Sequence, residues 1–303
     1  MQIPWVYHKD YDIPLPKNHR FSSSKFGDLY TLLKKIDLYH NAKIYEPFPA
    51  TEKQLLRVHT KEYIDKIKYG NLTDSEEKKL GLPWSNTLSN RSFLAVNGTF
   101  LTVKLALSNG IACHLAGGTH HAYSNYGSGF CVFNDIAFAA KNLLCENICQ
   151  KILVIDCDVH QGDGTANICN NNMNIYTCSI HARNNFPYTK AESDLDIELP
   201  DDISEDEYLR EIDKMLDECI RNIVPDIVIY DAGVDVHTND RLGRLSISTD
   251  GIYKRDSKII NFFQGKHIPI ATVIGGGYSA DPLELAERHS IVFRVVDDIF
   301  KDS

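Results

Sequence analysis

The sequence predicts an α/β fold, with a mostly parallel central sheet and helices on both of its faces. Two observations support this prediction. Short apolar, strand-like runs recur along the 303 residues, and helix-like segments lie between or beside most of them. Such alternation favours parallel strands joined by right-handed crossovers. The runs are 110–115, 151–157, 174–180, 226–230 and 268–274.

Local signals place several helices between these runs. Thr51-Glu-Lys-Gln54 and Ser204-Glu-Asp-Glu207 have the pattern of capping boxes, which open helices. The second is followed by apolar residues at helical spacing up to Pro225, which predicts an amphipathic helix. Further helices are expected over 91–108, over 134–146 and from Pro282 onward. The polar segment 71–89 is expected to be a loop.

Composition indicates one globular domain over residues 1–303. Hydrophobic residues make up 43% of the chain and charged residues 24%, which is ordinary for a globular protein. No linker, internal repeat or low-complexity tract divides the sequence. In folds of this class, binding sites form beyond the carboxyl ends of the strands, so those positions are the ones to search.

Charge and targeting signals narrow the partners. The formal net charge of −9 argues against direct binding to nucleic acid or to an anionic membrane, and it is compatible with a cationic substrate. No apolar run approaches about 18 residues and no secretory signal is visible, so we expect no membrane insertion and a cytoplasmic location. The eight scattered cysteines, without a CxxC pair, indicate reduced thiols.

The most informative segment follows the run 151–157. Asp156, Asp158 and His160 occur at spacing two directly after four apolar residues, and Asp163 follows closely. Alternate residues of a strand point to the same face. Charge next to a buried strand is costly unless it is paired or metal-bound. Strand periodicity alone therefore predicts that the first three residues bind one metal ion; a solvated acidic turn is the alternative.

Polar motifs follow three other strand-like runs. The run 110–115 leads to Gly117-Gly-Thr-His120-His121 and then to a glycine-rich loop that carries Phe130. This arrangement could form a catalytic pair and a substrate wall, or simply a surface histidine pair. The run 268–274 leads to Gly275-Gly-Gly-Tyr278, which would let a tyrosine reach inward; the alternative is a flexible loop.

The motif after the run 226–230 contains three candidate metal ligands. Asp231, Asp235 and Asp240 all lie in the stretch that follows this run, together with His237. Carboxylate and imidazole groups at a strand end are typical of metal or acid–base chemistry. Spacing alone does not choose among the three aspartates.

Taken together, the motifs resemble those of one family. HLAGGTHHA, GSGFCVFND, VIDCDVHQGDGT, DAGVD…NDRLG and GGGY are similar to segments of the zinc-dependent histone deacetylases, in the arginase–deacetylase superfamily. The resemblance covers nearly the whole chain, including Arg57-Val-His59-Thr-Lys-Glu-Tyr63 and His19-Arg20-Phe21. The short chain, the latter segment and 240–248 resemble the class IV-like and bacterial branch. The arginase–deacetylase fold is the implied architecture.

This resemblance implies a zinc site held by Asp158, His160 and Asp240, the aspartate before Arg-Leu-Gly. Three protein ligands leave an open position for water and substrate, as catalytic zinc requires. Because two carboxylates make the set rich in oxygen, Fe²⁺ or Co²⁺ are possible occupants as well.

The resemblance also implies catalytic roles. His120 and His121 would be the general acid–base pair, oriented by Asp156 and Asp163 respectively. Tyr278 would donate a hydrogen bond to the developing oxyanion. Further residues are implied as the walls of a substrate channel, namely Gly129, Phe130, Phe186, Gly276 and Gly277. A structural K⁺ site would use the Asp156 side chain, the Ser179 hydroxyl and backbone carbonyls that include Ile180.

The implied activity is hydrolysis of an amide bond. The substrate would be an acetylated or longer acylated lysine of a protein or peptide; acetylated polyamines or other small acylamines are the alternative. An arginase-like ureohydrolase with two manganese ions fits less well, because Gly162 stands where a further aspartate ligand is wanted. A non-enzymatic binder is disfavoured because all the matched catalytic residues are present. The oligomeric state is not readable from the sequence.

Overall fold

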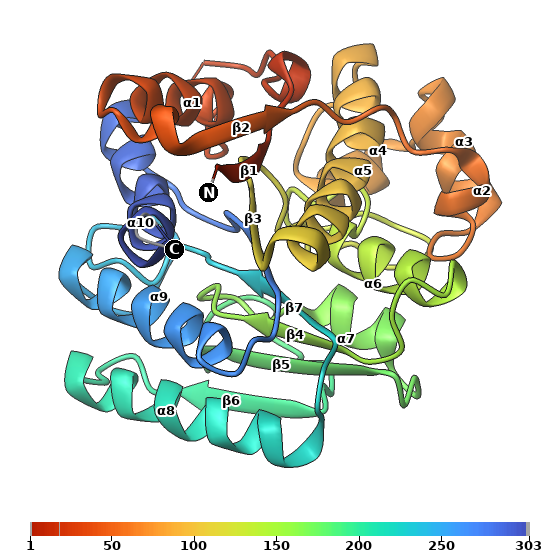
Figure 1. The fold of residues 1–303 in the computed structure, drawn as a ribbon. Helices are drawn as coiled ribbons and strands as arrows, with labels where there is room; N and C mark the ends of the chain where they lie inside the picture. The colour runs from red at the N-terminus through yellow and green to blue at the C-terminus, as the bar shows by residue number, and fades with distance from the viewer. Residues whose placement is uncertain (1, 18, 301–303) are drawn as a thin grey trace.

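One parallel sheet of eight strands runs through the described residues, 2–17 and 19–300, of the computed structural model (Figure 1). Its strand order is β2-β1-β3-β8-β7-β4-β5-β6. The strands are β1 (Ile3–Val6), β2 (Ala42–Tyr45), β3 (Ile111–His114), β4 (Ile152–Asp156), β5 (Ile175–Ala182), β6 (Leu195–Leu199), β7 (Ile227–Asp231) and β8 (Ile270–Val273).

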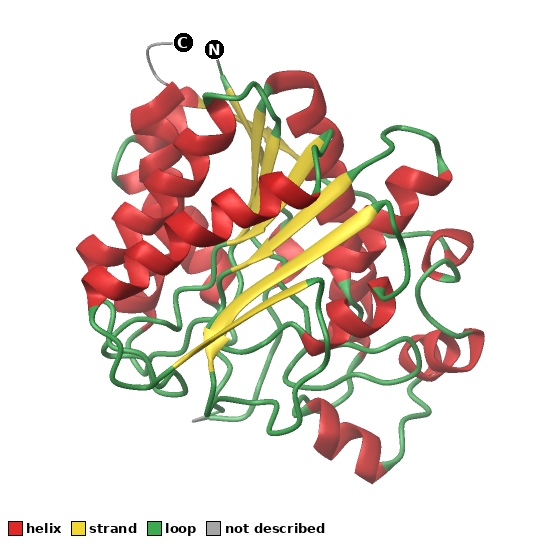
Figure 2. Ribbon diagram, turned by 90° about the horizontal axis from the view of Figure 1, so that it is seen from below, coloured by secondary structure: helices red, strands yellow, loops and turns green. Residues whose placement is uncertain are grey.

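Helices cover both faces of this sheet, as Figure 2 shows. One face carries α1 (Lys25–Lys35), α8 (Glu205–Asn222), α9 (Thr249–Gln264) and α10 (Pro282–Phe300). The other carries α5 (Asn86–Asn109), α6 (Asp135–Cys145) and α7 (Asp163–Cys169). Three short helices lie farther out, α2 (Glu52–Leu55), α3 (Lys61–Tyr69) and α4 (Asp74–Leu80). The predicted three-layer α/β architecture is confirmed.

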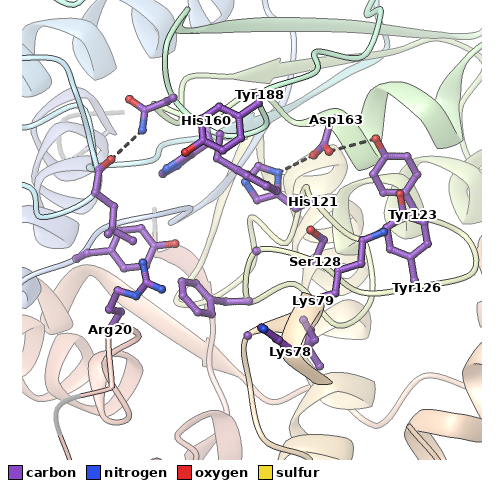
Figure 3. Close-up of a pocket in the computed structure, with 18 of the residues that line it drawn as sticks. Arg20, Lys78, Lys79, His121, Tyr123, Tyr126, Ser128, His160, Asp163 and Tyr188 are labelled. Atoms are coloured by element: carbon purple, nitrogen blue, oxygen red, sulfur yellow. Dashed lines mark hydrogen bonds and ion pairs between the residues drawn. The ribbon is translucent and has the colours of Figure 1, made fainter. Parts of the chain in front are cut away.

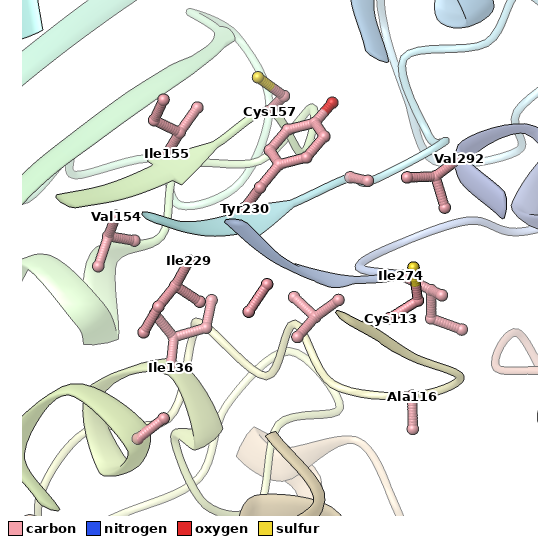
Figure 4. Close-up of a cluster of buried hydrophobic side chains, with 14 of the residues drawn as sticks. Cys113, Ala116, Ile136, Val154, Ile155, Cys157, Ile229, Tyr230, Ile274 and Val292 are labelled. Atoms are coloured by element: carbon pink, nitrogen blue, oxygen red, sulfur yellow. The ribbon is translucent and has the colours of Figure 1, made fainter. Parts of the chain in front are cut away.

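The apolar core lies between the sheet and both helix layers. Every residue of β4, β7 and β8 is buried. Because side chains alternate along a strand, Val154 and Ile155 point to opposite faces (Figure 4). Ile136 of α6 and Val292 of α10 belong to the same buried core. Apolar surface is therefore removed from water on both faces, as a parallel sheet requires.

Most of the expected elements are present. All five predicted strands form, and both predicted capping boxes are made, at Thr51 for α2 and at Ser204 for α8. The segment expected to be a loop contains α4, which opens with a further capping box between Thr73 and Glu76. The prediction of a loop there was wrong because this local cap was overlooked.

Strands β1, β2 and β6 were not predicted. β2 and β6 are the two edges of the sheet, where one side of the strand need not be apolar. β1 has only four residues and includes Pro4. All eight cysteines are unpaired, as expected for reduced thiols. Within the described residues, none of the helices is both long and apolar enough to span a bilayer.

The strand order explains how the site is assembled. β3, β8, β7 and β4 are consecutive neighbours in the middle of the sheet. These are the four strands that precede the polar motifs. Since all four run in parallel, their carboxyl ends open onto the same edge. Motifs from distant parts of the chain are thereby brought together.

Candidate active site

Three buried donors converge where β4 and β7 end. The Nδ1 atom of His160 lies 2.9 Å from Oδ1 of Asp158 and 3.1 Å from Oδ2 of Asp235. Ligand atoms of all three residues lie within 4.8 Å of one another. Two carboxylates and an imidazole form a donor set that suits zinc and also Fe²⁺ or Co²⁺. This cluster is the candidate metal centre.

Electrostatics around the cluster fit a divalent cation. Burial and the neighbouring Asp158 raise the pKa of Asp235 to about 7. Burial opposes protonation of His160, but hydrogen bonds to Asp158 and Asp235 outweigh it and raise its pKa to about 10. Protons thus bind tightly where the three donors meet. A divalent cation at that point would neutralise the same carboxylates and displace these protons.

Asp240 is not a member of this cluster, which contradicts the ligand set taken from the resemblance. Leu242 and Gly243 donate backbone N–H groups to its Oδ1 at 2.8 and 3.0 Å, and the Tyr278 amide donates to Oδ2 at 2.7 Å. Arg288 Nη1 lies 3.9 Å from the same Oδ2. Backbone donors already satisfy this carboxylate, and it holds the loop that carries Tyr278. Asp235 takes its place in the cluster.

Glycine lets the backbone reach the cluster. The N–H of Gly276 donates to Oδ2 of Asp158 at 2.7 Å. A Cβ at this position would lie only 2.2 Å from Asp235 Oδ2 and 2.4 Å from Asp158 Oδ2. Any side chain would therefore displace both carboxylates. The middle glycine of the triplet is needed for close approach, rather than for a flexible loop.

Beside the cluster, two buried histidines each lie against their own carboxylate. His120 Nδ1 is 2.7 Å from Asp156 Oδ2, and His121 Nδ1 is 2.6 Å from Asp163 Oδ1. Their Nε2 atoms face each other at 3.1 Å. The structure thus brings together the four residues predicted to form these two pairs. Tyr123, which the sequence reasoning missed, donates its hydroxyl to Asp163 Oδ2 at 3.1 Å.

The two histidines differ in protonation. Burial disfavours the charged form of both, but Asp156 and Asp158 raise the pKa of His120 well above its ordinary value. Burial and the neighbouring His120 instead lower the pKa of His121 to about 4, although Asp163 opposes the shift. One imidazole is therefore held charged beside a neutral one. Such divergence between neighbouring groups is typical of acid–base sites.

Asp231, the third candidate aspartate, lies behind the histidines. It is completely buried, and neither carboxyl oxygen has a hydrogen-bond partner within the described residues. One of its oxygens lies within 4.8 Å of ligand atoms of His120 and Asp156. Burial and the charge of Asp156 raise the pKa of Asp231 well above its ordinary value. A neutral carboxylic acid at this position adds no further charge to the crowded site.

A cavity of about 660 Å³ leads from the surface to these groups (Figure 3). His121, His160 and Asp163 lie along it, together with the predicted channel residues Gly129, Phe130 and Phe186. The Phe186 ring meets His121 edge-on, with ring centroids 4.8 Å apart. On the opposite wall, Phe130 and Tyr278 have centroids 5.9 Å apart. Gly129 and Phe130 both have positive φ, 54° and 66°, which turns the Phe130 ring into the channel wall.

The floor of the channel is small. A second cavity of about 30 Å³ lies among Phe21, Lys25, Phe26 and Tyr278, and reaches Asp158. It is also lined by Gly276, as predicted. Lys25, which sequence reasoning did not single out, is buried and donates to the Gly275 carbonyl at 3.0 Å.

Two remaining predictions have different outcomes. Gly277 packs against Val234 and His289, and a Cβ at this position would lie 2.7 and 2.8 Å from atoms of those two side chains. Among the described residues that line the two cavities, Gly277 is absent. For the K⁺ site, Asp156 and Ser179 are register partners on β4 and β5, and Ile180 follows. The Ser179 hydroxyl lies 2.9 Å from His181 Nδ1. Potassium binding stays a prediction.

Sequence comparison is consistent with this geometry. The family model described as a histone deacetylase domain matches residues 19–293. The chain belongs to the histone deacetylase family. Arabidopsis thaliana histone deacetylase 2 is 31% identical over 310 residues, covering 96% of this chain and 80% of its own. The present chain is also 41% identical over 300 residues to an uncharacterised protein of Picosynechococcus, and the alignment covers 99% of this chain and all of that protein.

Further relatives extend the family in bacteria. The acetoin utilization protein AcuC of Staphylococcus aureus is 30% identical over 258 residues, covering 78% of this chain and 66% of its own. Among solved structures, a histone deacetylase homologue from Aquifex aeolicus aligns with a TM-score of 0.80 at 22% identity, over 97% of this chain and 83% of that one. The chain therefore shares the fold of that histone deacetylase homologue.

Proposed function

We propose that the protein is a zinc-dependent amidohydrolase that removes an acetyl group from a lysine side chain. One observation carries the proposal. The two His–Asp pairs lie directly beside the Asp158–His160–Asp235 cluster, at the bottom of a channel walled by Phe130 and Phe186. A narrow apolar wall suits the methylene chain of lysine, and the polar groups at the end suit its amide.

The metal would be held by Asp158, His160 and Asp235. When bound, it would polarise the amide carbonyl and lower the pKa of water beside it. His121, neutral because of its lowered pKa, would accept the proton of the attacking water. The imidazolium formed on His121 would then pass that proton to the leaving amine, while His120, charged because of its raised pKa, lies against His121 through the Nε2 contact at 3.1 Å. Amide and water become a free amine and a carboxylate.

Tyr278 would stabilise the oxyanion that forms during attack. Its ring borders both the channel and the floor cavity, so the hydroxyl can reach a group placed between them. Burial keeps the hydroxyl protonated, because it raises the pKa of Tyr278 well above the usual value. A neutral donor in a site of low polarity is effective where negative charge develops.

The floor favours a short acyl group. The floor cavity has a volume of about 30 Å³, and Phe21 and Phe26 line it. An acetyl methyl group fits that space, whereas an octanoyl or myristoyl chain would have to displace the buried rings. We therefore propose acetyl-lysine, in one catalytic domain, rather than a long-chain acyl-lysine.

A turnover panel tests this proposal. The zinc-loaded protein is assayed with acetyl-, octanoyl- and myristoyl-lysine peptides of one sequence, and with acetylated polyamines. We expect the acetyl peptide to have the highest kcat/KM. No turnover of any acyl-lysine peptide would contradict the proposed function. Faster turnover of the myristoyl peptide would contradict the assignment of chain length alone.

A further inference from the structure

The channel mouth has a charge opposite to that of the whole chain. Over the sequence, 41 acidic residues outnumber 32 basic ones. Around the channel the balance is reversed: the only carboxylate among the described lining residues is Asp163, which lies deep beside His121 and Tyr123. The lining includes four side chains that are cationic at neutral pH, Arg20, Lys78, Lys79 and Arg244. All four of these residues are exposed.

Three of the cations, Arg20, Lys78 and Lys79, belong to segments that contact Phe130. Figure 3 labels all three at the channel. Lys78 and Lys79 form the last turn of α4, whose Leu80 carbonyl accepts the Phe130 N–H at 2.8 Å. Arg20 follows His19, whose Nε2 lies 3.0 Å from the Gly81 carbonyl. The end of α4 and the segment with Arg20 are thus tied to each other and to the channel wall.

The fourth cation lies on the Phe186 side. The N–H of Arg244 donates to the side chain of Asn185, the residue before Phe186, at 3.0 Å. Its guanidinium pairs with Asp201 at 2.8 Å, so it is partly neutralised. By contrast, none of the ion pairs within the described residues involves Arg20, Lys78 or Lys79. The Phe130 side therefore has three uncompensated charges.

Lys79 also has a second contact. Its Nζ lies over the ring of Tyr126, 3.3 Å from the ring centroid. Tyr126 in turn stacks on Tyr123, with centroids 4.7 Å apart, and Tyr123 donates to Asp163. The charge of Lys79 is therefore fixed in place at the rim, whereas Arg20 and Lys78 are the simpler positions to alter.

We infer that the acylated lysine is presented in an acidic peptide segment, whose carboxylates lie against Arg20, Lys78 and Lys79. This inference rests on the proposed function, and it names the substrate class. The part of a peptide that stays outside the channel faces this rim. Like charge disfavours a lysine-rich segment or an acetylated polyamine there, which overrides the weak expectation from the net charge of the whole chain.

The effect should be moderate and sensitive to salt. Exposed charges interact across water, and the Debye length is about 10 Å at 0.1 M ionic strength. Interactions of a few such pairs at low salt should change kcat/KM by about tenfold, mainly through KM and association. Raising the ionic strength to about 1 M shortens the Debye length to about 3 Å and should remove most of the preference.

The test uses three acetyl-lysine peptides that differ only at flanking positions, with Asp and Glu, with Gly and Ala, or with Lys and Arg. For the zinc-loaded protein at low salt, we expect kcat/KM of the acidic peptide to exceed that of the basic peptide by about tenfold. Arg20→Gln/Lys78→Gln should reduce that ratio, and Arg20→Glu/Lys78→Glu should reverse it.

A matched control removes two charges elsewhere. Lys104 and Lys266 are exposed, and both precede the amino ends of strands. Lys104 lies over the ring of Phe100 in α5, and Lys266, just after α9, lies over the ring of Phe262. Lys104→Gln/Lys266→Gln should keep the wild-type ratio. Suppose that the wild-type protein turns over the neutral peptide. Equal kcat/KM for the acidic and basic peptides, or a higher kcat/KM for the basic one, would then overturn this inference alone. No turnover of any of the three would overturn the proposed function and this inference with it.

Discussion

Asp235 and Asp240 lie on the same loop after β7, yet their carboxylates have opposite surroundings. Asp235 receives one backbone N–H, from Val159 at 2.8 Å, and its other oxygen faces His160. Asp240 receives three backbone N–H groups, from Leu242, Gly243 and Tyr278. The first carboxylate keeps an oxygen for a cation, whereas both oxygens of the second are already used.

This contrast teaches how to separate a candidate ligand from a support. A buried carboxylate with several backbone donors needs no metal, because those hydrogen bonds replace its hydration. A buried carboxylate beside another carboxylate and an imidazole is stable only with protons or a cation between them. Asp235 is in the second situation, so we propose it as a metal ligand, and we propose that Asp240 supports the loop that positions Tyr278.

The largest expected effect comes from Asp158, which contacts His160 directly. Asp158→Ala removes one of three donors, so the protein should lose its zinc and its activity should fall to background. Elemental analysis after dialysis, with the circular dichroism spectrum as the control for folding, measures this outcome. Zinc at one equivalent per chain in this variant would contradict the ligand assignment.

Tyr278 is on the loop that Asp240 holds, so Tyr278→Phe should lower the rate of the chemical step without changing the zinc content. Loss of one oxyanion donor typically lowers kcat by about 10²–10³-fold. We expect that decrease with an unchanged zinc content. Near wild-type kcat on acetyl-lysine would show that the hydroxyl does not act on the oxyanion.

Asp240→Asn should have an intermediate effect. The amide keeps one acceptor oxygen, but it cannot serve both the Leu242–Gly243 turn and the Tyr278 N–H. If the Tyr278 loop shifts, kcat should fall by about 10–100-fold, the range typical of supporting partners in metal sites. Zinc stays bound in this variant, and a further Tyr278→Phe change should add little. Fully additive losses would indicate that Asp240 acts elsewhere.

Zinc affinity should depend on pH, because His160 and Asp235 must lose protons before they can bind the metal. Without metal, the pKa of His160 is about 10 and that of Asp235 about 7, so zinc must displace a proton from His160 across pH 7–9 and one more from Asp235 below pH 7. Affinity should therefore fall by about tenfold per pH unit from pH 9 to 7, and more steeply below. Competition titrations with a chelator measure it; an affinity independent of pH would contradict these protonation states.

Much of the site could be predicted because strand ends in a parallel sheet are predictable. His120, His121, Asp156 and Asp163 all lie at or after the ends of recognisable strands, and their pairing at 2.7 and 2.6 Å is the one that the family resemblance implied. Strand periodicity alone had instead grouped Asp156 with Asp158 and His160 as metal ligands. Spacing alone could not separate Asp235 from Asp240, because the loop after β7 has no periodic backbone, and the resemblance favoured Asp240. Hydrogen bonding by Leu242, Gly243 and Tyr278 decides between them, and it depends on tertiary contacts.

The channel mouth was even less accessible to sequence reasoning. Arg20, Lys78 and Arg244 are separated along the chain, and only the fold places them around one opening. The segment with Lys78 was expected to be a loop, whereas the end of helix α4 fixes this charge beside Phe130. The net charge of the whole chain was compatible with a cationic substrate, and the local arrangement of charge at the mouth points the other way.

The most direct test of the account is the zinc content of two variants measured side by side. Asp235→Ala and Asp240→Ala are purified, loaded with zinc, dialysed and analysed for metal, with Asp158→Ala as the reference for loss. We predict that Asp235→Ala retains no zinc, whereas Asp240→Ala retains about one equivalent, the stoichiometry of a single catalytic site. Zinc retained by Asp235→Ala and lost by Asp240→Ala would contradict the central claim.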